Sequence, residues 1–154
     1  MTQATLTLID GMQFVVETGS KHSFVIDSGN SELGGRNTGP RPMELMAAGI
    51  GGCTAMDVIS ILHKMQQRVT GLQVKVTTKD AEEHPRKFLE IHIEYIVTGI
   101  NLAEKRVQRA IQLSEERYCP AMATIRPGTR ITNSCVLHEA NPGTLAKPVD
   151  INAN

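Results

Sequence analysis

Residues 42–66 of the chain read PMELMAAGIGGCTAMDVISILHKMQ, a stretch that begins with proline and is apolar on nearly every side. Proline suits the first turn of a helix, so the stretch predicts one helix over about these residues. A helix that is apolar nearly all round is a buried one. Gly49, Gly51 and Gly52 each cost about 1 kcal/mol against alanine in a helix interior. Their clustering indicates that another backbone or a substrate comes very close just before Cys53.

Short segments of alternating apolar and polar residues surround this helix and predict strands. Three precede it, and Asp10-Gly11 between the first two is a hairpin dipeptide. Two more strands, a second helix, a short helical turn and a last strand follow it, near residues 72–77, 89–97, 101–118, 121–125 and 130–137. The order βββ-α-ββ-α-α-β lacks the regular alternation of a doubly wound fold. We therefore expect an α+β protein, with an antiparallel sheet packed on a buried central helix.

The composition limits the classes of partner. The chain has 154 residues, which suits a single domain over residues 1–154, with an extended tail over residues 140–154. Its 16 basic and 16 acidic residues cancel, so nucleic acid is not expected as a partner. The N-terminus lacks the pattern of a secretory signal, and glycines and polar residues interrupt the apolar tract 45–62, so no membrane span is expected. We expect a cytoplasmic protein with free thiols.

Three cysteines are the candidates for chemistry. Cys53 lies in the middle of the long helix, where a buried cysteine is also a common small core residue. Cys119 precedes Pro120 at a helix break, which places it near a helix N-cap, where amide donors and the helix dipole would stabilise a thiolate. Cys135 lies on the last predicted strand, on the same apolar face as Ile131 and Leu137, and we expect it to be a core residue without a chemical role.

The run from Pro42 to Cys53 has the pattern P-x-E-L-x-A-A-G followed by cysteine, and the pair Cys119-Pro120 comes later. This combination resembles the OsmC/Ohr family, the osmotically inducible and organic hydroperoxide resistance proteins, and most of all its YhfA-like branch. The resemblance implies an OsmC-like fold in an intertwined homodimer with interface active sites. It implies a thiol-dependent hydroperoxide reductase, with Cys53 as the peroxidatic thiol and Cys119 as the resolving thiol. The substrate would be an organic hydroperoxide and the reductant a dithiol, such as a lipoylated protein, with no cofactor.

One part of the family pattern is missing. Members hold an arginine, anchored by a glutamate, against the peroxidatic sulfur, because an adjacent cation favours the thiolate. Met43 occupies the position of that glutamate, ten residues before Cys53, and Glu44 is about 100° further round the helix. Arg36 and Arg41 in the glycine-rich loop are the nearest replacements for the arginine, although both could be solvated loop charges.

Asp57 lies one helical turn after Cys53, on the same face. Paired with an arginine it would serve as the missing anchor, and unpaired it would disfavour the thiolate. It could equally face water or cap a neighbouring element.

Two other functions stay open. The chain could be a non-catalytic redox sensor, or a binding protein for a small apolar ligand that keeps the family's pocket. A metal site is not expected, because the three cysteines and five histidines show no C-x-x-C or H-x-x-x-H spacing.

Overall fold

The computed structural model describes residues 2–140 and has the element order that the sequence predicts. The mixed α+β class is confirmed, with three strands before the long helix and three after it. The chain divides into two compact units, Met1–Met46 and Ala47–Asn154. The expectation of a single domain over residues 1–154 stays a prediction. The predicted tail lies, from residue 141 onward, outside the described residues. The elements are β1 (Ala4–Asp10), β2 (Gln13–Thr18), β3 (Ser23–Ile26), α1 (Pro42–Lys64), β4 (Arg68–Asp80), β5 (Phe88–Ile100), α2 (Glu104–Leu113), α3 (Pro120–Ile125) and β6 (Arg130–Glu139).

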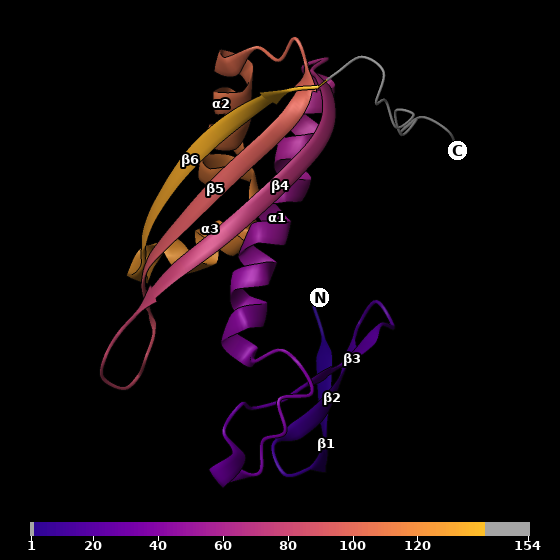
Figure 1. Ribbon diagram of the computed structural model, residues 1–154, viewed down its shortest axis with the longest axis vertical. Helices are drawn as coiled ribbons and strands as arrows, with labels where there is room; N and C mark the ends of the chain where they lie inside the picture. The colour runs from indigo at the N-terminus through magenta and orange to yellow at the C-terminus, as the bar shows by residue number, and fades with distance from the viewer. Residues whose placement is uncertain (1, 141–154) are drawn as a thin grey trace. The chain divides into compact units, whose positions relative to one another are not determined.

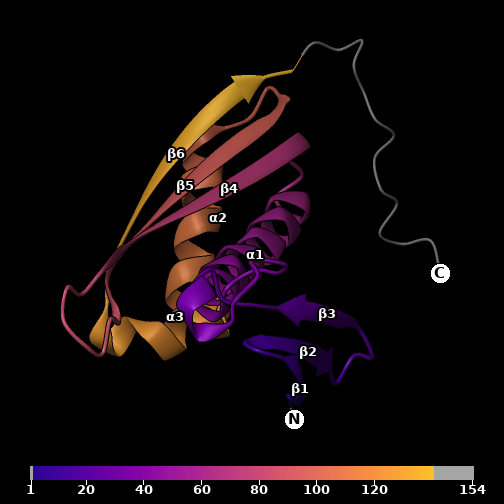
Figure 2. The same cartoon turned by 60° about the horizontal axis from the view of Figure 1, so that its bottom comes forward.

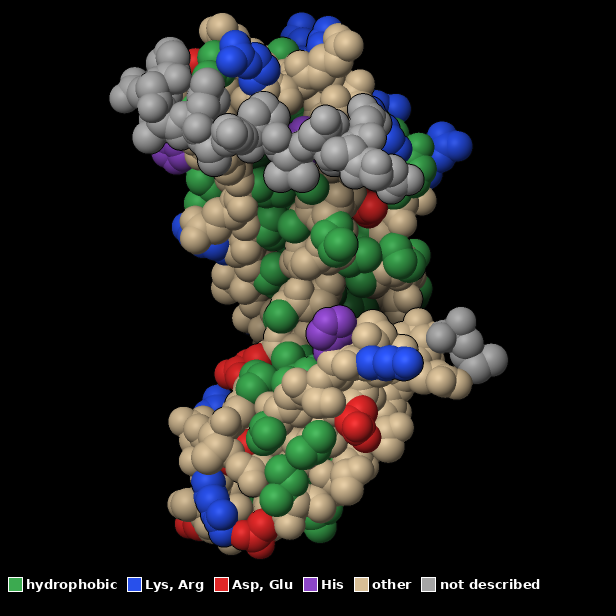
Figure 3. Space-filling model, turned by 90° about the vertical axis from the view of Figure 1, so that its right-hand side faces the viewer, with side chains coloured by type: hydrophobic (Ala, Val, Ile, Leu, Met, Phe, Trp, Pro, Cys, Tyr) green, Lys and Arg blue, Asp and Glu red, His purple; other side chains and the backbone are tan. Residues whose placement is uncertain are grey.

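The first unit contains a three-stranded antiparallel sheet in the order β1-β2-β3. The predicted hairpin between β1 and β2 is present, and Gly11 has a positive φ of 54° there, a conformation that glycine adopts without a steric penalty. Much of the apolar surface of this small sheet is exposed, and apolar side chains are visible on the unit in the lower part of Figure 3. The large apolar side chains that are exposed in this sheet and its turns include Leu6, Leu8, Ile9, Met12 and Phe24.

A buried carboxylate, Asp27, organises the glycine-rich loop that follows β3. Its side chain accepts hydrogen bonds from the backbone amides of Ser28 at 2.7 Å, Arg36 at 3.1 Å and Thr38 at 3.0 Å. The Thr38 hydroxyl donates a fourth bond, at 2.8 Å. The two bonds from Thr38 are the main cause of the low pKa of Asp27, which falls from 3.8 to about 2. The loop is therefore held by an ionised carboxylate and not by apolar packing.

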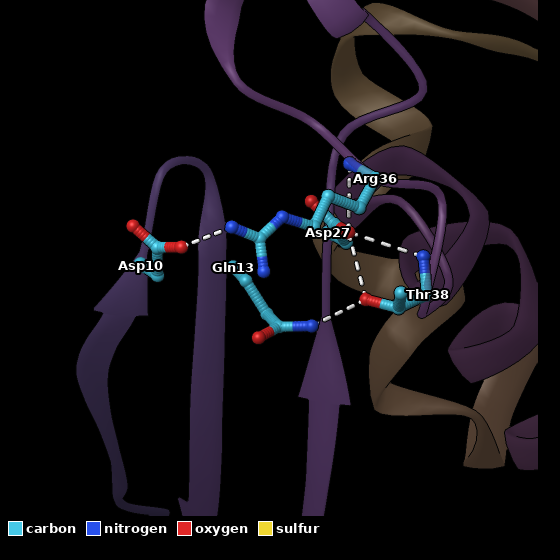
Figure 4. Close-up of polar contacts among 5 residues, drawn as sticks. All are labelled: Asp10, Gln13, Asp27, Arg36 and Thr38. Atoms are coloured by element: carbon cyan, nitrogen blue, oxygen red, sulfur yellow. Dashed lines mark hydrogen bonds and ion pairs between the residues drawn. The ribbon is translucent and has the colours of Figure 1, made fainter.

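The loop is also tied to the hairpin of the same unit. Figure 4 shows the Arg36 guanidinium against Asp10 and the Gln13 amide against the Thr38 hydroxyl. Both contacts join residues 27–38 to the β1–β2 turn. The conformation of the loop thus depends on polar contacts within the first unit.

The second unit has a sheet in the order β4-β5-β6, and one pairing corrects the sequence prediction. β4 and β5 are antiparallel as expected, but β6 runs parallel to β5. The connection between β5 and β6 explains this pairing. It contains α2 and α3 and returns the chain to the end of the sheet at which β5 begins, so β6 runs in the same direction as β5 (Figure 1). Parallel neighbours need such a crossover of a dozen or more residues.

Helices cover one face of this sheet. Within the second unit, α2 and the greater part of α1 lie on the same side of β4, β5 and β6 (Figure 2). Alternate residues of β5 form the inner layer, and Ile91, Ile93, Tyr95 and Val97 are completely buried. On the outer face His92 instead bonds the hydroxyls of Thr132 and Ser134 on β6. The helices therefore supply the remainder of the core, through Ile50, Val58, Leu62, Val107, Ala110, Ile111 and Met122.

Helix α1 is buried on one face within the chain, and not all round as its composition suggests. Gly51 faces β4, where an added Cβ would lie 2.8 Å from Cγ2 of Val76. Gly49 and Gly52 have no described atom within 4 Å of the position of a Cβ. The residues at four-residue spacing on this second face are exposed, namely Ala48, Gly52, Met56 and Ser60. Close packing of the helix backbone on the Val76 side chain therefore explains Gly51, whereas the second face of α1 has no cover among the described residues.

By length and composition alone, α1 is the one helix among the described residues that could cross a membrane. Its apolar window has a mean hydropathy of 1.7, and 28% of that window is buried within the chain. Core helices of soluble proteins meet the same criteria, so length and composition do not distinguish a membrane-spanning helix from a core helix. The face that carries Ile50, Val58 and Leu62 is a core surface packed on the sheet.

The role of Asp27 predicts how stability depends on pH. A carboxyl whose pKa is lower in the folded protein stabilises it above the unfolded pKa and loses this effect as the pH falls through the folded pKa. The contribution of Asp27 should therefore be lost between about pH 4 and pH 2. In Asp27→Asn, this part of the pH dependence of the unfolding free energy should be absent, and amides 28–38 should exchange hydrogen faster at pH 7. Glu32→Gln, an equal charge change in the same loop, should behave as wild type, and equal slopes for Asp27→Asn and wild type would contradict this role.

Candidate functional site

Three side chains with reactive or ligating atoms meet in the second unit, and they are Cys53, Asp57 and Cys119. The two Sγ atoms and a carboxylate oxygen all lie within 4.8 Å of one another. Cys53 and Asp57 are half-buried, and Cys119 is 3% exposed. The peroxidatic and resolving roles that the resemblance implies require the two thiols to meet, and the structure places them together as free cysteines.

Local geometry explains how two distant segments reach the same point. Cys53 and Asp57 lie one turn apart on α1, so their side chains share a face. Cys119 is the N-cap residue of α3, and Pro120 follows at the first helical position, as expected from the sequence. A π-helical turn, η2 (Ser114–Tyr118), comes directly before it. Such turns are frequent at functional sites, since the wider turn redirects the side chains beyond it.

The pKa of the Cys119 thiol is raised to about 11, which corrects the expectation of a stabilised thiolate. Burial is the largest cause, and the hydrogen bond with Cys53 adds to it. The amides of Met122 and Ala121, at the start of α3, act in the opposite direction but are outweighed. At neutral pH Cys119 is therefore a protonated thiol.

Asp57 accepts a hydrogen bond from the fully buried hydroxyl of Ser114, at 3.2 Å to its Oδ2 atom. Among residues 2–140 no ion pair includes Asp57. Asp57 is thus half-buried, and its partner is a side-chain hydroxyl and not a backbone amide, so this contact is not a cap of a neighbouring element.

The two candidate arginines belong to the first unit and have partners there. Arg36 pairs with Asp10, and the Arg41 guanidinium lies 3.7 Å from Glu44. Glu44 also accepts from the Arg41 backbone amide at 2.9 Å, which satisfies a free donor at the start of α1. Glu44 therefore has a capping role, and the activation of Cys53 by Arg36 or Arg41 stays a prediction.

A polar network that the sequence does not reveal lies beside the thiols. The buried Tyr95 hydroxyl donates to Glu115 at 3.1 Å, and Asn133 donates to the other Glu115 oxygen at 2.8 Å. Burial is the main cause of the raised pKa of Tyr95, and Glu115 and Cys119 raise it further. The Thr54 side chain acts in the opposite direction and lowers the pKa of this phenol, but burial outweighs it. The phenol is therefore a protonated, fixed donor next to the site.

Cys135 lies outside the group of three. It is half-buried on β6, in register with Tyr95 on β5, and burial raises its pKa. It packs against the core, as the alternation of the last strand predicts.

Four residues around this site are not marked by any sequence motif: Ser114, Glu115, Thr54 and Tyr95. A 3.6-residue period over residues 107–118 predicts that Ser114 and Tyr118 lie on the inner stripe of the second helix, and Ser114 is indeed buried. Tyr118 is instead 52% exposed, because the π-helical turn lies between the two residues and shifts the helical register. One signal in the sequence was available for Ser114, namely a serine among the apolar residues of a helix face. A hydroxyl buried there needs a hydrogen-bond partner within the protein.

The Tyr95 network is expected to contribute to stability. Tyr95→Phe should lower the unfolding free energy by about 1–3 kcal/mol, because the half-buried Glu115 carboxylate loses the donor that the buried Tyr95 hydroxyl supplies. Tyr118→Phe is the matched control, since its ring is exposed and should change stability by less than about 0.5 kcal/mol. Urea unfolding of both variants measures this difference, and equal stabilities would show that the bond is not significant.

Comparison with known proteins identifies the family. Residues 35–134 match the family model described as OsmC-like protein. Protein YhfA of Escherichia coli (strain K12) is 39% identical over 132 residues, which cover 86% of this chain and 95% of that protein. A hypothetical protein from Aquifex aeolicus VF5 has a solved structure with a TM-score of 0.80 and 28% identity, over 92% of this chain and 98% of that chain.

More distant structures share the fold alone. The organic hydroperoxide resistance protein OhrB of Bacillus subtilis matches with a TM-score of 0.60 and 17% identity, over 88% of this chain and 98% of that chain. The resemblance inferred from the cysteine motifs is thus confirmed, including its similarity to YhfA. The chain belongs to the OsmC-like family.

Proposed function

We propose that the protein reduces organic hydroperoxides with the thiols of Cys53 and Cys119. The observation that carries this proposal is that the two sulfur atoms lie within 4.8 Å of one another in the reduced protein. Membership of a family that includes organic hydroperoxide resistance proteins supports it. In sum, two thiols and one hydroperoxide give a disulfide, an alcohol and water.

The chemistry proceeds in two steps. The Cys53 thiolate attacks the peroxide O–O bond, takes one oxygen as a sulfenic acid, and the alkoxide leaves with a proton as the alcohol. The Cys119 sulfur then attacks the Cys53 sulfur, the S–O bond breaks, and water leaves. The disulfide protects Cys53 from oxidation to the irreversible sulfinic and sulfonic acids.

The burial of the two thiols supports this division of roles. Cys53 is half-buried and can meet a substrate, whereas Cys119 is 3% exposed and protonated at neutral pH. A protonated thiol is a poor nucleophile, so Cys119 is suited to act only once a sulfenic acid has formed beside it. Its proximity compensates for its low thiolate fraction, because an intramolecular reaction has a high effective concentration.

The disulfide requires a reductant that makes two sulfur exchanges in sequence, which a dithiol does. A lipoylated protein has such a dithiol, and the reaction uses no further cofactor. Reduction of this kind belongs in the cytoplasm, where thiols are kept reduced.

Activation of Cys53 completes the proposal. A basic group, Arg36 or Arg41, would approach Cys53 with Asp57 as its anchor. Among residues 2–140, only the Oδ2 atom of Asp57 accepts a hydrogen bond, from Ser114, so its Oδ1 atom is available for an arginine.

Stopped-flow reduction of an alkyl hydroperoxide tests the function. Cys53→Ser should lose activity completely. Cys119→Ser should complete one turnover, leave a sulfenic acid that dimedone traps on Cys53, and then become over-oxidised with excess peroxide. Cys135→Ser is the matched control and should keep wild-type rates, because that thiol lies outside the group. Peroxide reduction that survives in Cys53→Ser would exclude the mechanism.

A non-catalytic function in binding a small apolar molecule has one observation in its favour. A hollow of about 440 Å³ lies in the first unit, lined by Leu6, Met12, Phe14, Ile26, Asp27, Ser28, Arg41 and Pro42. Its walls are mainly apolar, which suits such a ligand. If wild-type protein fails to reduce hydroperoxides, this binding function and that of a non-catalytic redox sensor remain.

We also propose that the protein is an intertwined homodimer. The second face of α1 carries small residues and Met56, which is 74% exposed. In the first unit the sheet exposes several large apolar side chains. Apolar surfaces of this extent are typical of interfaces, and a second copy covering them would bury well above about 1,000 Å².

Light scattering at micromolar concentration should give the mass of a dimer. Met56→Glu places a charge on the open face of α1 and should shift the protein toward monomer. Val136→Glu is the control, because Val136 is 41% exposed on the outer face of the second sheet. A wild-type monomer, or dissociation caused equally by both variants, would refute the proposed interface.

A further inference from the structure

The group of Cys53, Asp57 and Cys119 is also a set of metal ligands. Two sulfur atoms and a carboxylate oxygen converge within 4.8 Å of one another. In a tetrahedral zinc site with Zn–S bonds of about 2.3 Å, the two sulfur atoms lie about 3.8 Å apart. Since the two sulfur atoms lie within 4.8 Å of one another, their separation has to decrease by about 1 Å at most to reach this spacing.

One contact orients a ligand. The buried Ser114 hydroxyl donates to Oδ2 of Asp57 at 3.2 Å, which orients the carboxylate, as outer-shell partners do in metal sites. The group therefore has the donor atoms of a metal site and a hydrogen bond that orients one of them.

The common sequence patterns of zinc sites do not include Cys53, Asp57 and Cys119. Those patterns consist of C-x-x-C and H-x-x-x-H pairs, whereas here Cys53 and Asp57 lie four residues apart on α1 and the third ligand is the N-cap residue of α3. Thiolate is a soft ligand and favours zinc over magnesium or calcium.

We propose that the reduced protein binds one Zn²⁺ ion through the Sγ atoms of Cys53 and Cys119 and the carboxylate of Asp57. A solvent molecule takes the fourth position of the tetrahedron. On binding, the two thiols release their protons to solvent and become thiolates. A disulfide between the same sulfur atoms removes two ligands, so the group holds either a metal ion or a disulfide.

This exclusion links metal binding to the redox state. Bound Zn²⁺ occupies the sulfur lone pairs and slows alkylation of Cys53, and oxidation of the pair releases the ion. The metal-binding step is independent of the proposed function. The further consequence that Zn²⁺ inhibits hydroperoxide reduction rests on that function.

Cobalt spectroscopy of the full-length, reduced and metal-free protein tests the site. Anaerobic titration with Co²⁺ should give one ion per chain, a thiolate-to-cobalt charge-transfer band, and the intense visible bands of four-coordinate cobalt. Zn²⁺ should then abolish these bands by displacement. A spectrum without charge transfer would overturn the proposal.

Variants assign the ligands. Cys53→Ser and Cys119→Ser should each lose the bands of the two-thiolate site, whereas Cys135→Ser should keep them. Zn²⁺ affinity should fall about tenfold or more in Asp57→Asn and about tenfold in Ser114→Ala. Circular dichroism of each variant confirms folding. Wild-type affinity in Asp57→Asn, or loss of the bands in folded Cys135→Ser, would contradict the assignment.

Oxidation without a hydroperoxide tests the metal site independently of the proposed peroxidase function. Diamide accepts two hydrogen atoms from a dithiol and leaves a disulfide, so it oxidises the pair without a hydroperoxide. Diamide-treated protein should bind no Zn²⁺ and should recover binding after reduction. Unchanged binding after complete oxidation of Cys53 and Cys119 would overturn the site, whatever the peroxidase assays show.

Discussion

The close packing of α1 on β4 at Gly51 is the contact on which the thiol site depends. A Cβ at residue 51 would lie 2.8 Å from Cγ2 of Val76, closer than side-chain atoms normally approach, so glycine lets the helix lie this near the sheet. Cys53 follows two residues later, on a helix held at that depth, and Asp57 follows one turn further. Cys119 then meets them at the N-cap of α3. The contact of Gly51 with the Val76 side chain thus helps to determine where the two thiols lie.

Cys53, Asp57 and Cys119 lie close together, and each has a side chain that is negatively charged when it is deprotonated. Two thiols and a carboxylate lie together, and among residues 2–140 no ion pair includes Asp57. Burial keeps Cys119 protonated, which removes one of the three charges. The disulfide removes the thiolates altogether, an arginine would neutralise the carboxylate, and a divalent cation would balance two charges at once. The proposed chemistry and the proposed metal site are therefore alternative solutions to one electrostatic problem.

Local patterns predicted the order of the elements, the hairpin at Gly11 and the position of Cys119 before Pro120, because each depends on residues near in the sequence. Features that depend on distant partners were not predictable. The parallel pairing of β6 follows from the path of a long crossover, and Ser114 contacts a residue 57 positions away. The π-helical turn has no residue signature of its own. For this reason the sequence identified both thiols but not the side chains that support them.

Cys53 and Cys119 are proposed to form one redox pair within a chain. Peptide mapping by mass spectrometry tests this pairing after reduced protein receives one equivalent of an alkyl hydroperoxide. A single linked peptide should join Cys53 to Cys119, with Cys135 still a free thiol. The isotope pattern from a mixture of labelled and unlabelled protein should show that both cysteines come from the same chain. A Cys53–Cys135 link, or a Cys53–Cys53 link between chains, would contradict it.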